Sequence, residues 1–358
     1  MNTKKISIII PIYNAMPYLE ECLSSVVSQD YSDKEIILID NGSCDGSLQV
    51  CEDYAIKYSC VKMYKVNDFS IGAARNLGLK KADGEYIMFV DADDILPDRS
   101  VVSKMYKKTS AKAADICVGN FSRLWGEKIL HASSHRKFSR YDTSGAPFLF
   151  TGFFSVDTLS YVWAKMYRAS FIRDNDISFT DCVYAEDKLF NLICAAKGAK
   201  YVFLNREVYI HRNTPSSVSN SYRIHTHMVW PEIAGILKER LERDGLLNDL
   251  WENIIAYTIF FGCFFDCKME YEYTDKNAGS VVRLLKNYAI DPLSKKSFRM
   301  LTRVKCISMI PSRLYRILIF GFAVCMSMHM YRVLAFGIKL ITDLKIDEML
   351  SDTGRKPS

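Results

Sequence analysis

The first 120 residues alternate short apolar runs with segments of helical periodicity, and this alternation limits the possible folds most. The apolar runs of strand length are Ile6–Ile10 (interrupted by Ser7), Ile36–Ile39, Val61–Tyr64 (interrupted by Lys62) and Tyr86–Val90. Between the first two, residues 18–27 place apolar side chains three and four positions apart, as in a helix with one buried face. Repeated strand–helix units join parallel strands through right-handed crossovers. The sequence therefore predicts an α/β fold with a mostly parallel central sheet.

The fourth apolar run ends in three carboxylates within four positions, those of Asp91, Asp93 and Asp94. Like charges this close repel each other unless a cation lies among them or solvent screens them. Open α/β sheets bind ligands beyond the carboxyl ends of their strands, so we expect a divalent metal here. The alternative is a solvated acidic turn.

Polar motifs also follow the other predicted strands. Pro11-Ile12-Tyr13-Asn14 follows the first strand, and residues 40–46 (DNGSCDG) follow the second. A third motif, residues 72–78 (GAARNLG), lies near the start of a helix that Ser70 is placed to cap. Each motif alone is compatible with an ordinary turn or a solvated helix. Their order and spacing predict a nucleotide site at one edge of the sheet.

Taken together, these motifs resemble the nucleotide-binding signature of family 2 glycosyltransferases, which are inverting enzymes with the GT-A fold. The resemblance continues in residues 162–168, 184–190 and 208–212, and bacterial cell-surface polysaccharide enzymes are most similar. It implies a GT-A domain over residues 1–220, with a nucleotide-binding half (1–120) and an acceptor half (121–220). A helical C-terminal region, 221–358, follows.

The resemblance also implies roles for individual residues on the donor side. The residues expected at the nucleotide are Pro11, Tyr13, Asn14, Asp40, Asn41, Arg75, Asp91, Ala92 and Asp93. Arg75 is expected to neutralise phosphate charge. Asn41 can both donate and accept hydrogen bonds, so it suits uracil and also other bases, and UDP is the starting expectation.

Asp93 and Asp91 are the expected ligands of Mg²⁺ or Mn²⁺, by similarity to the family's DxD motif. His211 either completes the metal shell or is a structural histidine. Asp94 is either a second ligand or, as we favour, the cap of the helix that follows.

An inverting displacement needs a base that takes the proton of the acceptor hydroxyl. The resemblance assigns this role to Asp187, with Glu186 orienting the acceptor or its neighbours. Without that context, two acids at the start of a helix over residues 186–196 would only favour its dipole. Trp163 and Lys165 are candidates for the acceptor site, with core packing the alternative for Trp163. Arg212 is a candidate to close over the diphosphate.

Between residues 295 and 345 the chain has ten Lys or Arg residues and one acid, Asp343. Residues 317–331 carry no charge, which suits an amphipathic helix in the interface of an anionic membrane. The alternative is a buried helical subdomain with a basic outer face.

No run reaches the roughly 18 to 20 apolar residues of a membrane span, and no nucleic-acid module accompanies the positive charge of residues 295–345. Eleven cysteines without C-x-x-C pairs favour a reducing compartment. We therefore expect a cytoplasmic protein, peripheral at the cytoplasmic face of the membrane.

The sequence thus predicts a metal-dependent, inverting glycosyltransferase of the hexosyltransferase type. It would move a sugar from a nucleotide sugar, with UDP expected, to a hydroxyl of a lipid-linked glycan in bacterial surface polysaccharide biosynthesis. One alternative is a catalytically silent nucleotide-sugar-binding or membrane scaffold protein. Another is a sugar-phosphate nucleotidyltransferase, but Pro11-Ile12-Tyr13-Asn14 is not the Gly-rich phosphate loop that such an enzyme needs after its first strand.

Overall fold

The computed structural model describes residues 4–66, 68, 70–131, 135, 139–182, 184–214 and 229–344. These residues form two compact units. The sheet unit comprises described residues within 1–139 and 159–214, and the helical unit comprises those within 140–158 and 229–344. The predicted domain boundary at residue 220 lies outside the described residues.

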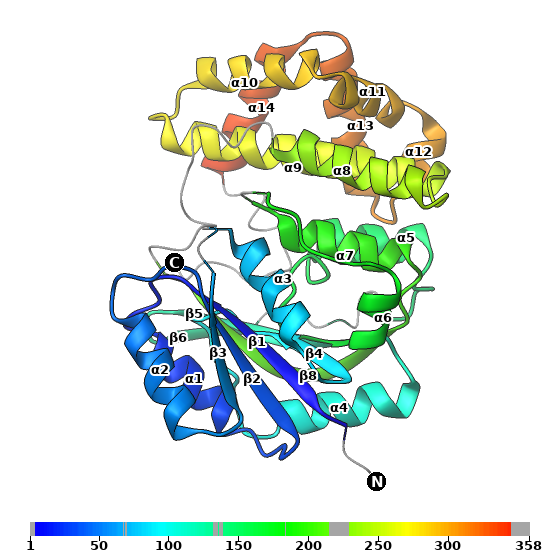
Figure 1. The fold of residues 1–358 in the computed structure, drawn as a ribbon. Helices are drawn as coiled ribbons and strands as arrows, with labels where there is room; N and C mark the ends of the chain where they lie inside the picture. Colours follow the sequence, from blue (N-terminus) through cyan, green and yellow to red (C-terminus); the bar gives the residue numbers. More distant parts are fainter. Residues whose placement is uncertain are drawn as a thin grey trace. The chain divides into compact units, whose positions relative to one another are not determined.

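Eight strands form one sheet in the described part of the sheet unit, in the order β3-β2-β1-β4-β7-β5-β6, with β8 paired to β5 (Figure 1). The strands are β1 (Ile6–Ile12), β2 (Lys34–Asp40), β3 (Val61–Lys65), β4 (Tyr86–Phe89), β5 (Ile116–Trp125), β6 (Lys128–His131), β7 (Lys165–Arg168) and β8 (Tyr201–Arg212). β1 to β4 are parallel to one another, whereas β7 is antiparallel to both β4 and β5. This arrangement confirms the predicted α/β fold with a mostly parallel sheet.

The helices predicted over residues 18–27 and 186–196 are present among the helices of the sheet unit, close to the predicted limits. The helices of this unit are α1 (Leu19–Val27), α2 (Ser47–Lys57), α3 (Ile71–Lys81), α4 (Val101–Lys112), α6 (Ala169–Asp174) and α7 (Glu186–Ala196). Ser70 caps α3 as predicted, because its Oγ accepts a hydrogen bond from Ala73 N at 3.3 Å.

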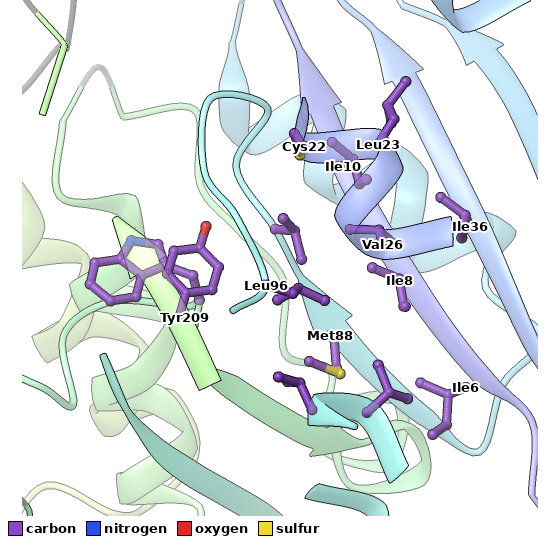
Figure 2. Close-up of a cluster of buried hydrophobic side chains, with 14 of the residues drawn as sticks. Ile6, Ile8, Ile10, Cys22, Leu23, Val26, Ile36, Met88, Leu96 and Tyr209 are labelled. Carbon is purple, nitrogen blue, oxygen red and sulfur yellow. The ribbon is translucent and has the colours of Figure 1, made fainter. Parts of the chain in front are cut away.

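The two faces of the sheet are covered by different helices. On one face, Ile8 and Ile10 lie beside Val26 and Leu23 of α1, in one buried cluster that also includes Ile6, as Figure 2 shows. On the other face, α3 approaches β1 so closely that a Cβ on Gly78 would lie 2.3 Å from Ile9 Cγ2. Only glycine permits this approach, which holds α3 and the Arg75 one turn earlier against the sheet.

The helical unit contains α5 (Ala146–Phe150), a π-helical turn η2 (Thr151–Ser155), α8 (Val229–Arg243), α9 (Asp249–Tyr273), α10 (Ala278–Ile290), α11 (Pro292–Leu301), α12 (Val304–Ser308), α13 (Arg313–Ser327) and α14 (Tyr331–Asp343). Phe154 of η2 stacks on Phe261 of α9 with ring centroids 5.2 Å apart. The segment 140–158 therefore belongs to the helical unit although most of its sequence neighbours belong to the sheet unit.

The prediction of one amphipathic helix over residues 317–331 is wrong. α13 ends at Ser327, and His329 adopts a left-handed backbone with φ +58°. Met330 N then donates to Cys325 O at 2.8 Å, which closes the turn before α14 begins at Tyr331. None of the helices within the described ranges is long and apolar enough to cross a membrane.

Candidate active site

The loops that follow β1 and β2 are tied together by side chains of the predicted motifs. Asn14 Oδ1 accepts from Cys44 N at 2.8 Å, and Asn14 N donates to Ser43 Oγ at 3.1 Å. Asp45 Oδ2 accepts from Met16 N at 2.9 Å. The two motifs predicted at the nucleotide therefore form one structure at the carboxyl ends of their strands.

Other residues predicted at the nucleotide differ widely in exposure. Tyr13 is 56% exposed, whereas Pro11 and Ala92 are buried. The buried carboxylate of Asp40 accepts from Gly42 N at 3.2 Å, and Asn41 Nδ2 donates to Ser70 O at 3.2 Å. Asp40 and Asn41 thus shape the loops at this edge, and their contact with a base or ribose stays a prediction.

Arg75 lies at the centre of the predicted catalytic carboxylates. Its Nη1 donates to Glu186 Oε1 at 2.7 Å and also to Asp187 Oδ1. Its Nη2 donates to Asp91 Oδ1 at 3.0 Å. The side chain of Arg75 is 2% exposed, so its charge is shared among three carboxylates. Its predicted role in neutralising phosphate is untested, and in this structure both terminal nitrogens of the guanidinium, Nη1 and Nη2, donate to protein carboxylates.

The segment before α7 holds Arg75 in place. Asn76 Nδ2 donates to Phe179 O, and Phe179 N donates back to Asn76 Oδ1, both at 2.9 Å. The Arg75 guanidinium lies over the Phe179 ring, 5.4 Å from its centroid. A Cβ on Gly72 would lie 2.5 Å from Thr180 O, so this close contact also requires glycine. The motif at residues 72–78 is therefore a packing surface that positions one guanidinium.

Asp187 lies in the first turn of α7 and has two kinds of partner. Its Oδ1 meets Arg75, and its Oδ2 accepts from Val162 N at 3.2 Å. Burial raises the pKa of Asp187 above its ordinary range, and the Arg75 guanidinium opposes this rise. Asn191, one turn later, donates to Tyr161 O at 3.2 Å and to Asp187 O at 2.9 Å. These bonds fix the 160–162 segment beside the carboxylate.

The acidic loop after β4 is built against the end of β8. Tyr209 OH accepts from Asp91 N at 3.0 Å, and Asp94 Oδ1 accepts from Arg212 N at 2.7 Å. Arg212 Nε also donates to Asp93 O at 3.0 Å, while its Nη2 donates to Glu21 Oε2 at 2.5 Å. Arg212 therefore binds the loop backbone, and its predicted closure over a diphosphate is untested.

The favoured interpretation of Asp94 as a helix cap is wrong. The next helix, α4, begins at Val101 with Ser100 at its N-cap, six residues downstream. Asp94 is fully buried and lies 3.2 Å from His211 Nδ1. Burial alone would lower the pKa of His211, but the Asp94 carboxylate raises it. The pair holds the loop to β8 because each group favours the charged form of the other.

Asp93 is the acid of this loop least compensated by protein cations. Burial, together with the charges of Asp94 and Asp91, raises the pKa of Asp93 to about 7. Among the described residues, no three His, Cys, Asp or Glu side chains are grouped to hold a metal ion by themselves. Mg²⁺ at phosphate sites, however, uses one or two carboxylates together with the phosphates. Asp91 and Asp93 fit that requirement, and His211 as a third ligand stays a prediction.

Sequence reasoning missed the roles of Tyr209 and Asn191. Tyr209 and His211 are two positions apart on β8, so they project from the same face of the sheet. This spacing could have indicated that Tyr209 faces the acidic loop together with His211.

Trp163 stacks on the rings of Tyr209 and His211, with centroids 4.9 Å and 5.3 Å away, and is 4% exposed. Core packing, the alternative for Trp163, is therefore what the structure shows. Lys165 is also buried, at 1% exposure, and does not line an open acceptor site.

Comparison with known proteins now identifies the domain. Residues 7–161 match the family model of glycosyl transferase family 2. This segment is a family 2 glycosyltransferase domain. The match ends before Glu186 and Asp187, so it covers the donor motifs and not the proposed base.

Two curated relatives and one solved structure show how far the family 2 likeness extends. The cholesterol galactosyltransferase of Borreliella burgdorferi is 29% identical over 275 residues, 75% of this chain and 76% of the relative. The poly(ribitol-phosphate) beta-N-acetylglucosaminyltransferase TarS of Staphylococcus aureus is 27% identical over 58% of this chain, but only 35% of the length of TarS is covered. The crystal structure of TarS 1–349 with UDP-GlcNAc superposes with a TM-score of 0.66 over 95% of this chain and 92% of that chain, at 19% identity. This structural likeness confirms the predicted GT-A fold.

Proposed function

We propose that this chain is an inverting glycosyltransferase that moves a sugar from a nucleotide sugar to a hydroxyl of a glycan acceptor. The observation that carries the proposal is the network in which one buried guanidinium, that of Arg75, joins Asp91 to Asp187. Asp91 and Asp187 keep 25% and 17% of their side chains exposed, whereas Arg75 keeps 2%. The carboxylates of Asp91 and Asp187 are therefore both accessible to solvent, and each is held in place by its hydrogen bond to the buried guanidinium of Arg75.

In the proposed reaction, Asp187 is the base. The acceptor oxygen forms a bond to the anomeric carbon while Asp187 takes the hydroxyl proton, and the bond from that carbon to the diphosphate oxygen breaks with its electron pair on the diphosphate. The raised pKa of Asp187 favours proton transfer. Glu186 shares Arg75 with Asp187 and so orients the carboxylate. No covalent sugar intermediate is needed.

We assign Asp91 and Asp93 to the leaving-group side. Asp91, Glu186 and Asp187 surround the one guanidinium of Arg75, and Asp93 lies two residues from Asp91 without an ion pair to that guanidinium, so the site carries excess negative charge that a cation would balance. A Mg²⁺ or Mn²⁺ held by Asp93 and Asp91 would neutralise charge that develops on the diphosphate. Metal dependence is a proposal supported by this donor set.

The donor is proposed to be a UDP-sugar, and the acceptor a lipid-linked glycan of the bacterial surface. Support comes from TarS, which binds UDP-GlcNAc and is named for transfer to poly(ribitol-phosphate). The galactosyltransferase relative, named for cholesterol, acts on a lipid. A peripheral position at the cytoplasmic face of the membrane would bring the site to such an acceptor.

The proposal is tested by incubating the purified full chain with UDP-sugars and GDP-sugars, with Mg²⁺, Mn²⁺ or EDTA, and with lipid-linked glycans. Metal-dependent release of one nucleoside diphosphate, with an inverted anomeric configuration by NMR, supports it. Nucleotide-sugar binding without release in any combination would favour the catalytically silent protein. Formation of a nucleotide sugar from a nucleoside triphosphate and a sugar phosphate would favour the nucleotidyltransferase.

A further inference from the structure

The helix α13 has two apolar faces, and only one is covered. Ile319, Phe322 and Met326 are buried within the helical unit. On the opposite side Leu314, Ile317 and Phe320 are 46%, 70% and 42% exposed. These three are spaced three residues apart, so they follow one another along the outer side of the helix.

The helix α14 and the turn before it continue the pattern. Leu334, Ala335 and Ile338 are buried, whereas Val333, Phe336 and Leu340 are exposed. The exposed fractions in the turn and on α14 run from 39% to 64%. The hairpin surface is defined here as the exposed apolar residues Leu314, Ile317, Phe320, Met328, Met330, Val333, Phe336 and Leu340. Large apolar side chains repeated along two consecutive helices mark an interaction surface, because isolated exposure would be scattered.

Positive charge accompanies the hairpin surface. Arg313 and Arg332 are exposed at the first turns of the two helices and form no ion pair with any residue in the described ranges. The acid of this segment, Asp343, is already paired with Lys276 at 3.1 Å and Lys339 at 3.0 Å. The surface is therefore apolar and cationic, without free negative charge of its own.

We propose that the hairpin surface docks on a membrane that contains anionic lipids, with α13 and α14 lying in the headgroup region. Anionic phosphates complement Arg313 and Arg332, and the acyl boundary covers the apolar side chains. A second copy of the chain would instead bring the same arginines against each other. The helices have 15 and 13 residues, which suits lying in the interface. This inference deepens the membrane location in the proposed function and does not depend on the transfer chemistry.

Sedimentation with vesicles tests the docking. The full chain is mixed with vesicles of phosphatidylcholine alone, or with roughly a third phosphatidylglycerol. The apolar variant is Ile317→Glu with Phe336→Glu, and the charge variant is Arg313→Glu with Arg332→Glu. Matched controls are Ile56→Glu, because Ile56 is 86% exposed on α2, and Lys107→Glu, because Lys107 is exposed on α4.

We expect the wild type and both controls to sediment with the anionic vesicles, and both hairpin variants to lose about tenfold or more in vesicle affinity. Unchanged melting temperatures and unchanged transfer to a water-soluble acceptor show that the variants fold and that the active site is intact. A variant that melts early is replaced by the single change Ile317→Ser, for which the same loss is expected. Wild-type protein that stays in the supernatant, or hairpin variants that sediment like the controls, would overturn the proposal. A wild-type dimer that these variants convert to a monomer without vesicles would also overturn it, in favour of self-association.

Discussion

Arg75 Nη1 donates a hydrogen bond to Glu186 Oε1 at 2.7 Å, although the two residues lie 111 positions apart. The same guanidinium donates to Asp91 Oδ1 at 3.0 Å through Nη2. The loop after β4 and the first turn of α7 are therefore held by one buried cation. In the proposed reaction this arrangement couples the leaving-group side of the site to the base.

Arg75→Met should destabilise the sheet unit strongly. The change leaves Asp91, Glu186 and Asp187 without their shared cation, and breaking a buried ion pair in this way costs about 3–5 kcal/mol. Urea unfolding measures the loss. The control Lys107→Met removes an exposed cation and should change stability by about 0.5 kcal/mol or less. A loss for Arg75→Met no larger than that of the control would refute the role of Arg75 as the centre of the network.

The hydrogen-bond network of Arg75 also shows which features of the site could be predicted from the sequence alone. The start of α3 and the limits of α7 followed from local signals, namely the Ser70 cap and apolar spacing, and both helices form. The partners of Arg75 could not follow from such signals, because they lie 16, 111 and 112 positions away. The resemblance supplied the residues of the site but assigned Arg75 to phosphate.

Tyr209→Phe should weaken metal-dependent nucleotide binding. It removes the acceptor of Asp91 N and leaves a partly buried donor unpaired, which costs about 1–3 kcal/mol. Calorimetric titration with UDP and Mn²⁺ measures the affinity. Tyr31→Phe is the matched control, since Tyr31 OH donates to Lys4 O at 2.7 Å. We expect the control to lose stability without losing UDP affinity. Equal UDP affinities for the two variants would contradict the positioning role of Tyr209.

Asp266→Asn should change how stability depends on pH. Burial raises the pKa of Asp266 to about 7, although Tyr288 OH and Trp230 Nε1 donate to it at 2.6 Å and 3.2 Å. The folded chain therefore holds a proton that the unfolded chain releases above the ordinary value of 3.8, and stability falls as pH rises towards about 7. The slope from this group is at most about 1.4 kcal/mol per pH unit.

Urea unfolding at several pH values measures the effect of Asp266→Asn. The stability of the variant relative to the wild type should rise between about pH 4 and about pH 7 and then level off. Parallel stability curves for the two proteins over this range would show that Asp266 is not protonated in the fold.

The limits of the helices near the C-terminus and the strand β7 within residues 121–180 could not be predicted, because local sequence signals do not encode them. The uncharged run 317–331 looks continuous, but His329 turns the backbone there without a glycine or proline to signal it. β7 has four residues and is defined by its antiparallel pairing with β4 and β5, which no local pattern encodes. Likewise, the sequence around Asp94 favoured a helix cap, but the partners that Asp94 has in the structure, His211 and Arg212, belong to β8, which lies far away in the sequence.

The most direct test concerns the separate roles proposed for Asp93, as metal ligand, and Asp187, as base. The variants Asp93→Ala and Asp187→Asn are each assayed for sugar transfer and for metal-dependent UDP binding. Both should abolish transfer, and a lost base alone lowers kcat by about 10²–10⁴-fold. Only Asp93→Ala should strongly weaken UDP binding with Mg²⁺ or Mn²⁺. Glu186→Gln, which keeps an oxygen for Arg75, should retain more activity than Asp187→Asn. Unchanged turnover in Asp187→Asn would contradict the central claim.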